Sequence, residues 1–142
     1  MLDSPALRDA TPTGVASRPA WPWAFMACAG LMGAAGVMVG AAGAHNGGGE
    51  LTRISSEFLL IHAAVLVAAS AVSLVLGRRS AVWVMALGLL AVGAVLFSGE
   101  LAMAGLLNRR PVPLAAPTGG LCLIAGWLLL ALSAVFNGFR RR

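Results

Sequence analysis

Long apolar runs separated by short polar segments dominate the pattern of this chain. Four such runs cover approximately residues 23–44, 58–76, 81–107 and 120–136. They do not alternate polar with apolar positions, so the pattern indicates helices rather than the strands of a membrane barrel. A helix of about 20 residues crosses a hydrocarbon core about 30 Å thick. The chain is therefore predicted to be all-α, an integral membrane bundle of four helices.

The segments between the runs predict short connections and an up-down-up-down topology. Residues 45–56 contain three consecutive glycines, Gly47 to Gly49, which favour a helix stop. Residues 77–80 are short enough for a tight turn between antiparallel helices. Residues 108–118 contain Pro111, Pro113 and Pro117, which predict a stiff extended loop before a tight entry into the last helix at Gly119 and Gly120.

The two ends of the chain differ from its membrane domain, residues 21–139. Residues 1–20 contain three prolines among polar residues and are predicted to form an extended arm, and residues 140–142 form a basic tail. Four spans place both ends and the 77–80 turn on one side, which then holds seven of the ten arginines. The positive-inside rule assigns that side, and both termini, to the cytoplasm.

Composition supports a membrane protein and argues against nucleic-acid binding. Hydrophobic residues make up 59% of the chain and charged residues 11%, with a mean hydropathy of +0.88. A soluble domain has about 45–50% apolar and about 25% charged residues. The net charge of +5 comes from arginines that stand singly or in short clusters between the apolar runs. That distribution is typical of membrane-flanking loops, so the lipid bilayer is the predicted partner.

Four ionisable residues near the predicted non-cytoplasmic side form a candidate polar cluster: His45, Glu57, His62 and Glu100. His62 follows Glu57 by five residues, about 7.5 Å at helical rise, and Glu100 precedes the end of its run by seven residues. We therefore expect His62 and Glu100 to lie at similar depth and to pair. Such a pair either relays protons or binds a cation, or it locks helices together by hydrogen bonds. The structural role is favoured, because a proton path needs polar residues in the other leaflet and these are scarce.

Other chemistry has less support in the sequence. Two histidines suffice for haem or metal ligation only if both face one cavity, and no CxxCH or HExxH motif accompanies them. Cys28 and Cys122 lie inside apolar runs without metal-ligand spacing. No recognisable nucleophile–base arrangement is present, so neither a cofactor nor an enzymatic activity is predicted.

Glycines in the first run predict close helix packing. Gly33, Gly36, Gly40 and Gly43 recur at helical spacing and include a GxxxG pair, which allows the backbones of two helices to approach closely. The pattern leaves open whether the partner helix belongs to this chain or to another protein.

Several short motifs, taken together, resemble those of one family. They are Gly40-Ala-Ala-Gly-Ala-His45, Ile61-His62-Ala63, Leu96-Phe-Ser-Gly99, Ala116-Pro-Thr-Gly-Gly120 and Gly126-Trp127. In this order they are similar to the motifs of the YgdD-like family of small bacterial inner-membrane proteins, which has a relative in animal mitochondria. The resemblance covers about residues 23–136. It implies a four-helix protein of the bacterial inner membrane and a domain of unknown function. Glu100 and Leu101 depart from the family pattern, which commonly has a small residue and tyrosine there.

Three classes of function are consistent with these observations. The first is an accessory or structural subunit packed against other subunits of a larger membrane complex, respiratory or photosynthetic. The second is a small oligomeric transporter or proton-coupled protein that uses the His/Glu cluster, and it requires self-association. The third is a cofactor-bearing electron carrier, which rests on two histidines alone. The first is the function that the sequence favours.

Overall fold

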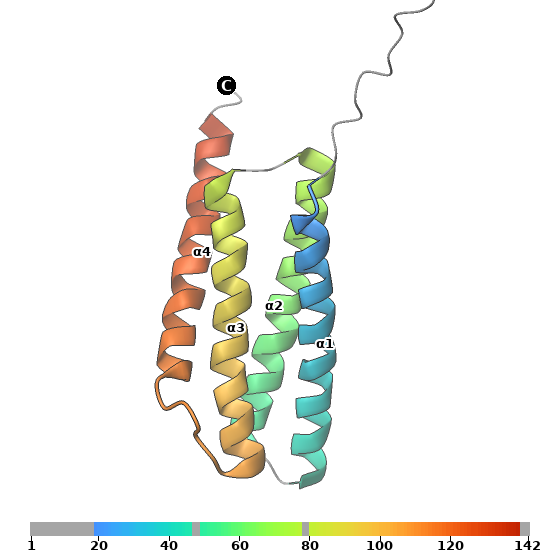
Figure 1. Ribbon diagram of the computed structural model, residues 1–142, viewed down its shortest axis with the longest axis vertical. Coiled ribbons are helices and arrows are strands. Elements are labelled where there is room, and N and C mark those ends of the chain that lie inside the picture. Colours follow the sequence, from blue (N-terminus) through green and yellow to red (C-terminus); the bar gives the residue numbers. More distant parts are fainter. Residues whose placement is uncertain (1–18, 47–48, 78–79, 140–142) are drawn as a thin grey trace, which may run out of the picture.

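The fold consists of four long helices that run up and down. The computed structural model describes residues 19–46, 49–77 and 80–139 (Figure 1). The helices are α1 (Trp21–Asn46), α2 (Gly49–Leu76), α3 (Ala81–Leu107) and α4 (Ala115–Phe139). Each contains a stretch that is long and apolar enough to cross a membrane. The predicted all-α membrane bundle of four helices is therefore confirmed. Nearly all of the predicted arm, the two arginines of the 77–80 turn and the basic tail lie outside the described residues.

The helices form an open rather than a closed bundle. α3 packs against α4 and α2 and also touches α1, and α1 packs mainly against α2 (Figure 1). In the part of the chain that the structure describes, the backbone of α4 approaches only that of α3. In the most hydrophobic stretch of α2 and of α3, 39% and 44% of the residues are buried. In the corresponding stretches of α1 and α4 only 17% and 22% are buried. One side of the bundle, between α4 and α2, is therefore not closed by helix–helix contact.

The core of the described residues is formed mainly by α2 and α3, with contributions from α1 and from Leu123 of α4. Leu66, Leu87 and Leu90 are completely buried, and Leu90 faces Gly126 of α4. Large apolar side chains also cover the outside, such as Leu31 on α1 and Val75 on α2, which are 75% and 80% exposed. Water would make such a surface unfavourable, whereas the hydrocarbon of a bilayer solvates it. The described helices are therefore apolar both inside and outside.

α2 begins earlier than the sequence analysis predicted. The segment from residue 50 to 57 was expected to be mostly connection, yet α2 starts at Gly49. Its first turns are amphipathic: Thr52, Ser55 and Ser56 are buried, and Arg53 and Glu57 are exposed. A helix that exposes charges on one face and buries small polar groups on the other forms readily outside the hydrocarbon. The helix stop expected at the glycines falls partly on residues 47–48, outside the described residues.

α4 also begins earlier than predicted. It starts at Ala115, so the loop from Asn108 is shorter than expected and Pro117 lies in the first helical turn. Proline is tolerated there because the first N–H groups of a helix have no intrahelical partner. The loop leaves α3 through Asn108, whose left-handed backbone (φ 50°) directs its N–H to the carbonyl of Met103.

Candidate functional site

Buried polar side chains on α2 attach this helix to both of its neighbours. The hydroxyl of Ser55 donates to the carbonyl oxygen of Ser98 on α3 at 2.7 Å. The hydroxyl of Ser56 donates to the carbonyl oxygen of Gly36 on α1 at 2.7 Å. Hydrogen bonds between the helices of membrane proteins contribute about 0.6–2 kcal/mol each. This polar face therefore serves first to fix helix positions.

His62 lies on the same face of α2 and is only 5% exposed. Its Nδ1 lies 2.7 Å from the carbonyl oxygen of Phe58, one turn earlier, and its Nε2 accepts a hydrogen bond from Nε1 of Trp127 on α4 at 3.4 Å. A donor at Nδ1 and an acceptor at Nε2 correspond to one neutral tautomer. Both nitrogens therefore have protein partners, and His62 links α2 to α4 across the open side of the bundle.

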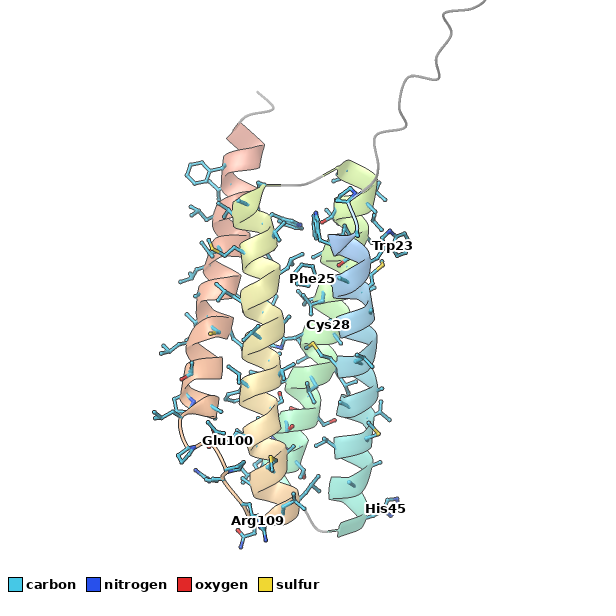
Figure 2. The ribbon with its side chains drawn as sticks, viewed as in Figure 1. Trp23, Phe25, Cys28, His45, Glu100 and Arg109 are labelled. Carbon is cyan, nitrogen blue, oxygen red and sulfur yellow. The ribbon has the colours of Figure 1, made fainter. Side chains whose placement is uncertain are left out.

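Glu100 caps the start of α4. Its carboxylate accepts a hydrogen bond from the N–H of Ala116 at 2.5 Å, and its side chain is buried (Figure 2). The neighbouring N–H groups are also satisfied, since Ala115 donates to Val112 and Pro117 has no N–H. A carboxylate at a helix N-terminus also interacts favourably with the helix dipole. Glu100 thus accepts from the N–H of Ala116, which has no partner within α4, and attaches α4 to α3.

His62 and Glu100 do not pair. The bond between Ser55 and Ser98 sets the register of the antiparallel helices α2 and α3, and it places Glu100 level with about Arg53. His62 is about nine residues further along α2, or roughly 13 Å at helical rise. The expectation of equal depth was wrong because it counted from a start of α2 near residue 58 instead of Gly49.

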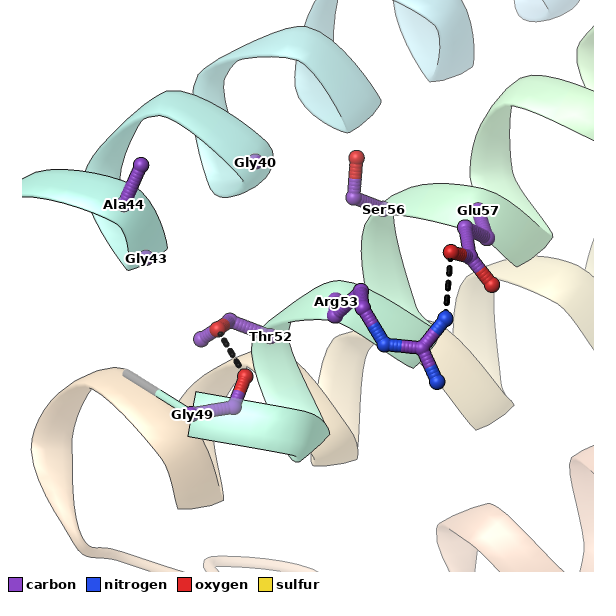
Figure 3. A pocket seen from close by; sticks show the side chains of 8 residues that line it. All are labelled: Gly40, Gly43, Ala44, Gly49, Thr52, Arg53, Ser56 and Glu57. Carbon is purple, nitrogen blue, oxygen red and sulfur yellow. Dashed lines mark hydrogen bonds and ion pairs between the residues drawn. The ribbon is translucent and has the colours of Figure 1, made fainter. Parts of the chain in front are cut away.

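The remaining members of the predicted cluster lie at the end of the bundle. Arg53 forms an ion pair with Glu50 on the exposed face of α2. It forms a second ion pair, at 2.5 Å, with Glu57 (Figure 3). His45 lies near the end of α1 and is exposed (Figure 2). α2 has 28 residues, about 42 Å of helix, so roughly 12 Å extends beyond a hydrocarbon core of about 30 Å. The charged residues of α2 lie in that extension, and the four residues do not form one cluster.

The glycine stripe of α1 packs against α2 of the same chain. A Cβ atom built on Gly36 would lie 2.9 Å from Leu60, and one on Gly40 would lie 2.8 Å from the hydroxyl of Ser56. Gly33 faces Ala63, and Gly43 faces Thr52. Between Gly40, Gly43 and the start of α2 lies a pocket of about 420 Å³ with Arg53 and Glu57 among its lining residues (Figure 3). The partner left open by the sequence is therefore an internal helix.

An apolar cleft of about 500 Å³ occupies the open side between α2 and α4. It is lined by Phe58 and His62 of α2, Phe97 of α3, and Gly120, Leu123, Ile124, Trp127 and Leu128 of α4. The rings of Phe58 and Phe97 are in contact, with centroids 4.7 Å apart. The cleft thus combines an almost wholly apolar wall with the single polar bridge between His62 and Trp127.

The arrangement offers little for proton transfer or metal binding. Within the described ranges, no group of three or more His, Cys, Asp or Glu side chains could hold a metal ion. From His62 towards the C-terminal end of α2, the next buried polar side chain of this helix is Ser70, about 12 Å away at helical rise. Leu66 lies between them and is completely buried. Ser73, further along, accepts a hydrogen bond from Nε1 of Trp83 at 2.8 Å, which fixes α2 to α3.

Sequence reasoning missed the partners of these polar groups. The contact of Trp127 with His62 joins two of the motifs that carried the family resemblance, and Phe97 and Gly120 from two others line the same cleft. The spacing of Glu50, Arg53 and Glu57, at intervals of three and four residues, was the available signal for an early start of α2. No signal in one sequence revealed that Glu100 would bond to a backbone N–H.

Comparison with known proteins identifies a family and no function. Residues 39–120 match the family described as protein of unknown function DUF423. This match confirms the resemblance recognised in the motifs. No curated protein and no solved structure matches the chain.

Proposed function

We propose that this chain, which belongs to the DUF423 family of proteins of unknown function, is a non-enzymatic accessory subunit that packs beside a larger membrane complex, respiratory or photosynthetic. Its four apolar helices make it a multi-pass membrane protein in contact with the bilayer. One observation supports a structural role above all. The two buried ionisable side chains of the described residues, His62 and Glu100, each form a hydrogen bond with a neighbouring helix.

The outer faces of α1 and α4 offer lateral surfaces for such a complex. On α1, Leu31, Val37 and Met38 are 61–75% exposed and none carries charge. The glycine stripe no longer supports an external partner, because it packs against α2. Docking in the membrane then depends on side-chain packing over these outer faces, as is usual between transmembrane helices.

Native membranes test this proposal directly. After extraction in mild detergent, native electrophoresis and mass spectrometry are expected to find the chain in a large complex with stoichiometric partners. Tryptophan substitutions at exposed positions, one on each helix, then locate the contact: Val37, Val67, Val92 and Leu132. Substitution on the docking face should release the chain, and the other three should leave the complex intact. Migration of the unmodified chain alone or as a small homo-oligomer would refute the proposal.

The alternative, a small oligomeric transporter, has less support, because apolar residues separate His62 from the next buried polar group. In liposomes with a pH gradient we expect no flux above that of empty liposomes. A flux that His62→Ala and Glu100→Gln abolish, while the helical content stays unchanged, would favour transport instead.

We also propose that both termini lie in the cytoplasm of a bacterium and that the protein resides in the inner membrane. Seven of the ten arginines on the side of the termini support this orientation. A reporter that is active only in the cytoplasm should be active when fused after Arg142 and inactive when inserted in the loop 108–114. The reverse result would invert the topology.

A further inference from the structure

We propose that the cleft between α2 and α4 is a lipid site: it binds one acyl chain of an anionic phospholipid whose phosphate is held by Arg109 and Arg110. This site goes beyond the accessory role and does not depend on it.

The shape and lining of the cleft suit an acyl chain. Its walls are aromatic and aliphatic, and both nitrogens of His62 already have protein partners. No polar group of the lining is therefore free to select a polar ligand, and an apolar chain is the matching occupant. At Gly120 a Cβ atom would meet nothing within 4 Å, so this glycine keeps one end of the cleft wide.

The dimensions of the cleft suit an extended chain. From Gly120 to Leu128 it follows α4 for about 12 Å at helical rise. Its volume is about 500 Å³. A single acyl chain is much thinner than a helix with its side chains, which is about 10–12 Å wide, and it can lie along the cleft between α2 and α4.

The depth of the cleft matches one leaflet. α4 has 25 residues, about 37 Å, which exceeds the hydrocarbon thickness by roughly 7 Å. Phe58 of α2, which lines the cleft, directly follows the part of α2 that extends beyond the hydrocarbon. The cleft therefore begins near the edge of the hydrocarbon and continues along α4 for about 12 Å, within the half-thickness of about 15 Å. A chain whose headgroup lies at the loop 108–114 would therefore run along the cleft.

Charge complementarity identifies the headgroup. Arg109 and Arg110 lie in the loop between α3 and α4, and both are exposed. Arg109 marks this end of the bundle in Figure 2. Among the described residues neither forms an ion pair, in contrast to Arg53, whose charge is balanced by two glutamates. Two unbalanced guanidinium groups at the membrane surface attract a phosphate, and arginine binds it in a bidentate manner.

Native mass spectrometry of the full chain in mild detergent tests the site, with phosphatidylglycerol and phosphatidylcholine of identical acyl chains as probes. We expect one phosphatidylglycerol to bind with preference over phosphatidylcholine. Each arginine near the surface contributes about fivefold, so the double variant Arg109→Gln/Arg110→Gln should weaken phosphatidylglycerol binding about thirtyfold and remove the preference.

Two glycine variants test the location of the acyl chain. Gly120→Phe places a ring in the open space of the cleft and should lower binding about tenfold or more. Gly99→Phe is the matched control, since Gly99 is exposed on α3 outside the cleft and also has open space around it. If Gly120→Phe fails to fold by circular dichroism, Ile124→Trp at the same wall replaces it.

Three outcomes would overturn the proposal. Equal binding of phosphatidylglycerol and phosphatidylcholine would show that Arg109 and Arg110 do not recognise the headgroup. Full binding by Gly120→Phe or Ile124→Trp would place the acyl chain elsewhere. A homodimer that either cleft variant dissociates would show that a second copy covers the cleft instead of a lipid.

Discussion

A close contact between the backbones of α3 and α4 predicts different stabilities for substitutions at two adjacent glycines. Gly119 of α4 faces the backbone of α3: an added Cβ atom would lie 2.5 Å from the nitrogen of Phe97 and 2.8 Å from the carbonyl oxygen of Gly93. Ordinary contact begins at 3.4 Å, so Gly119→Ala requires α4 to move by about 0.9 Å. Backbone atoms cannot rotate away, and overpacking of this kind costs about 1–3 kcal/mol. Within the described ranges the backbone of α4 approaches that of α3 and of no other helix, so no second helix compensates for the shift.

Gly120→Ala is the control for the same experiment. Both substitutions gain about 0.8–1.0 kcal/mol of helix propensity, but only Gly119 lacks space for the methyl group. Gly119→Ala should therefore be less stable than Gly120→Ala by about 1–3 kcal/mol. Unfolding with SDS in mixed micelles, followed by circular dichroism, measures this difference. Equal stability of the two variants would refute the close approach of α3 and α4.

Two further hydrogen bonds and one ion pair give additional predictions. Glu100→Gln keeps an acceptor for the N–H of Ala116 and should retain most of the stability, whereas Glu100→Ala should lose about 1–2 kcal/mol; equal losses in micelle unfolding would argue against the cap. Ser73→Ala removes the acceptor of the Trp83 indole and should cost about 1 kcal/mol. It should also shift the emission maximum of the tryptophan fluorescence, and an unchanged spectrum would contradict the bond. Arg53→Gln should leave the unfolding midpoint unchanged, because its two ion pairs are exposed to solvent; a clear drop would show that they hold the end of α2.

Hydropathy was sufficient to predict the helices but not where α2 and α4 begin. The length and continuity of the apolar runs locate the membrane-crossing parts, because a bilayer imposes a minimum length on them. The start of α2 lies outside the hydrocarbon, where polar residues are compatible with a helix, so a hydropathy reading treated it as a loop. The start of α4 was missed because Pro117 suggested a loop. Proline is tolerated in the first turn of a helix and interrupts it only beyond that turn.

The partners of the polar residues were not predictable in the same way. The expected pairing of His62 with Glu100 needed the register between α2 and α3, and that register is set by Ser55 and by the true start of α2. Apolar runs contain no information about register, since any axial shift keeps them inside the bilayer. The glycine stripe was readable as a packing surface, but its partner became known only with the arrangement of α1 and α2.

The order of contacts along the chain has a consequence for biogenesis. After α1, every helix has its predecessor as a principal neighbour, so membrane insertion and lateral assembly can follow the order of synthesis. Leu123 of α4 belongs to the core of the described residues, so this core is complete only after α4 has left the ribosome. The final step is then the packing of α4 against α3, where Gly119 faces Gly93, and this step also creates the second wall of the cleft. A nascent chain that stops before α4 therefore lacks both part of its core and the cleft.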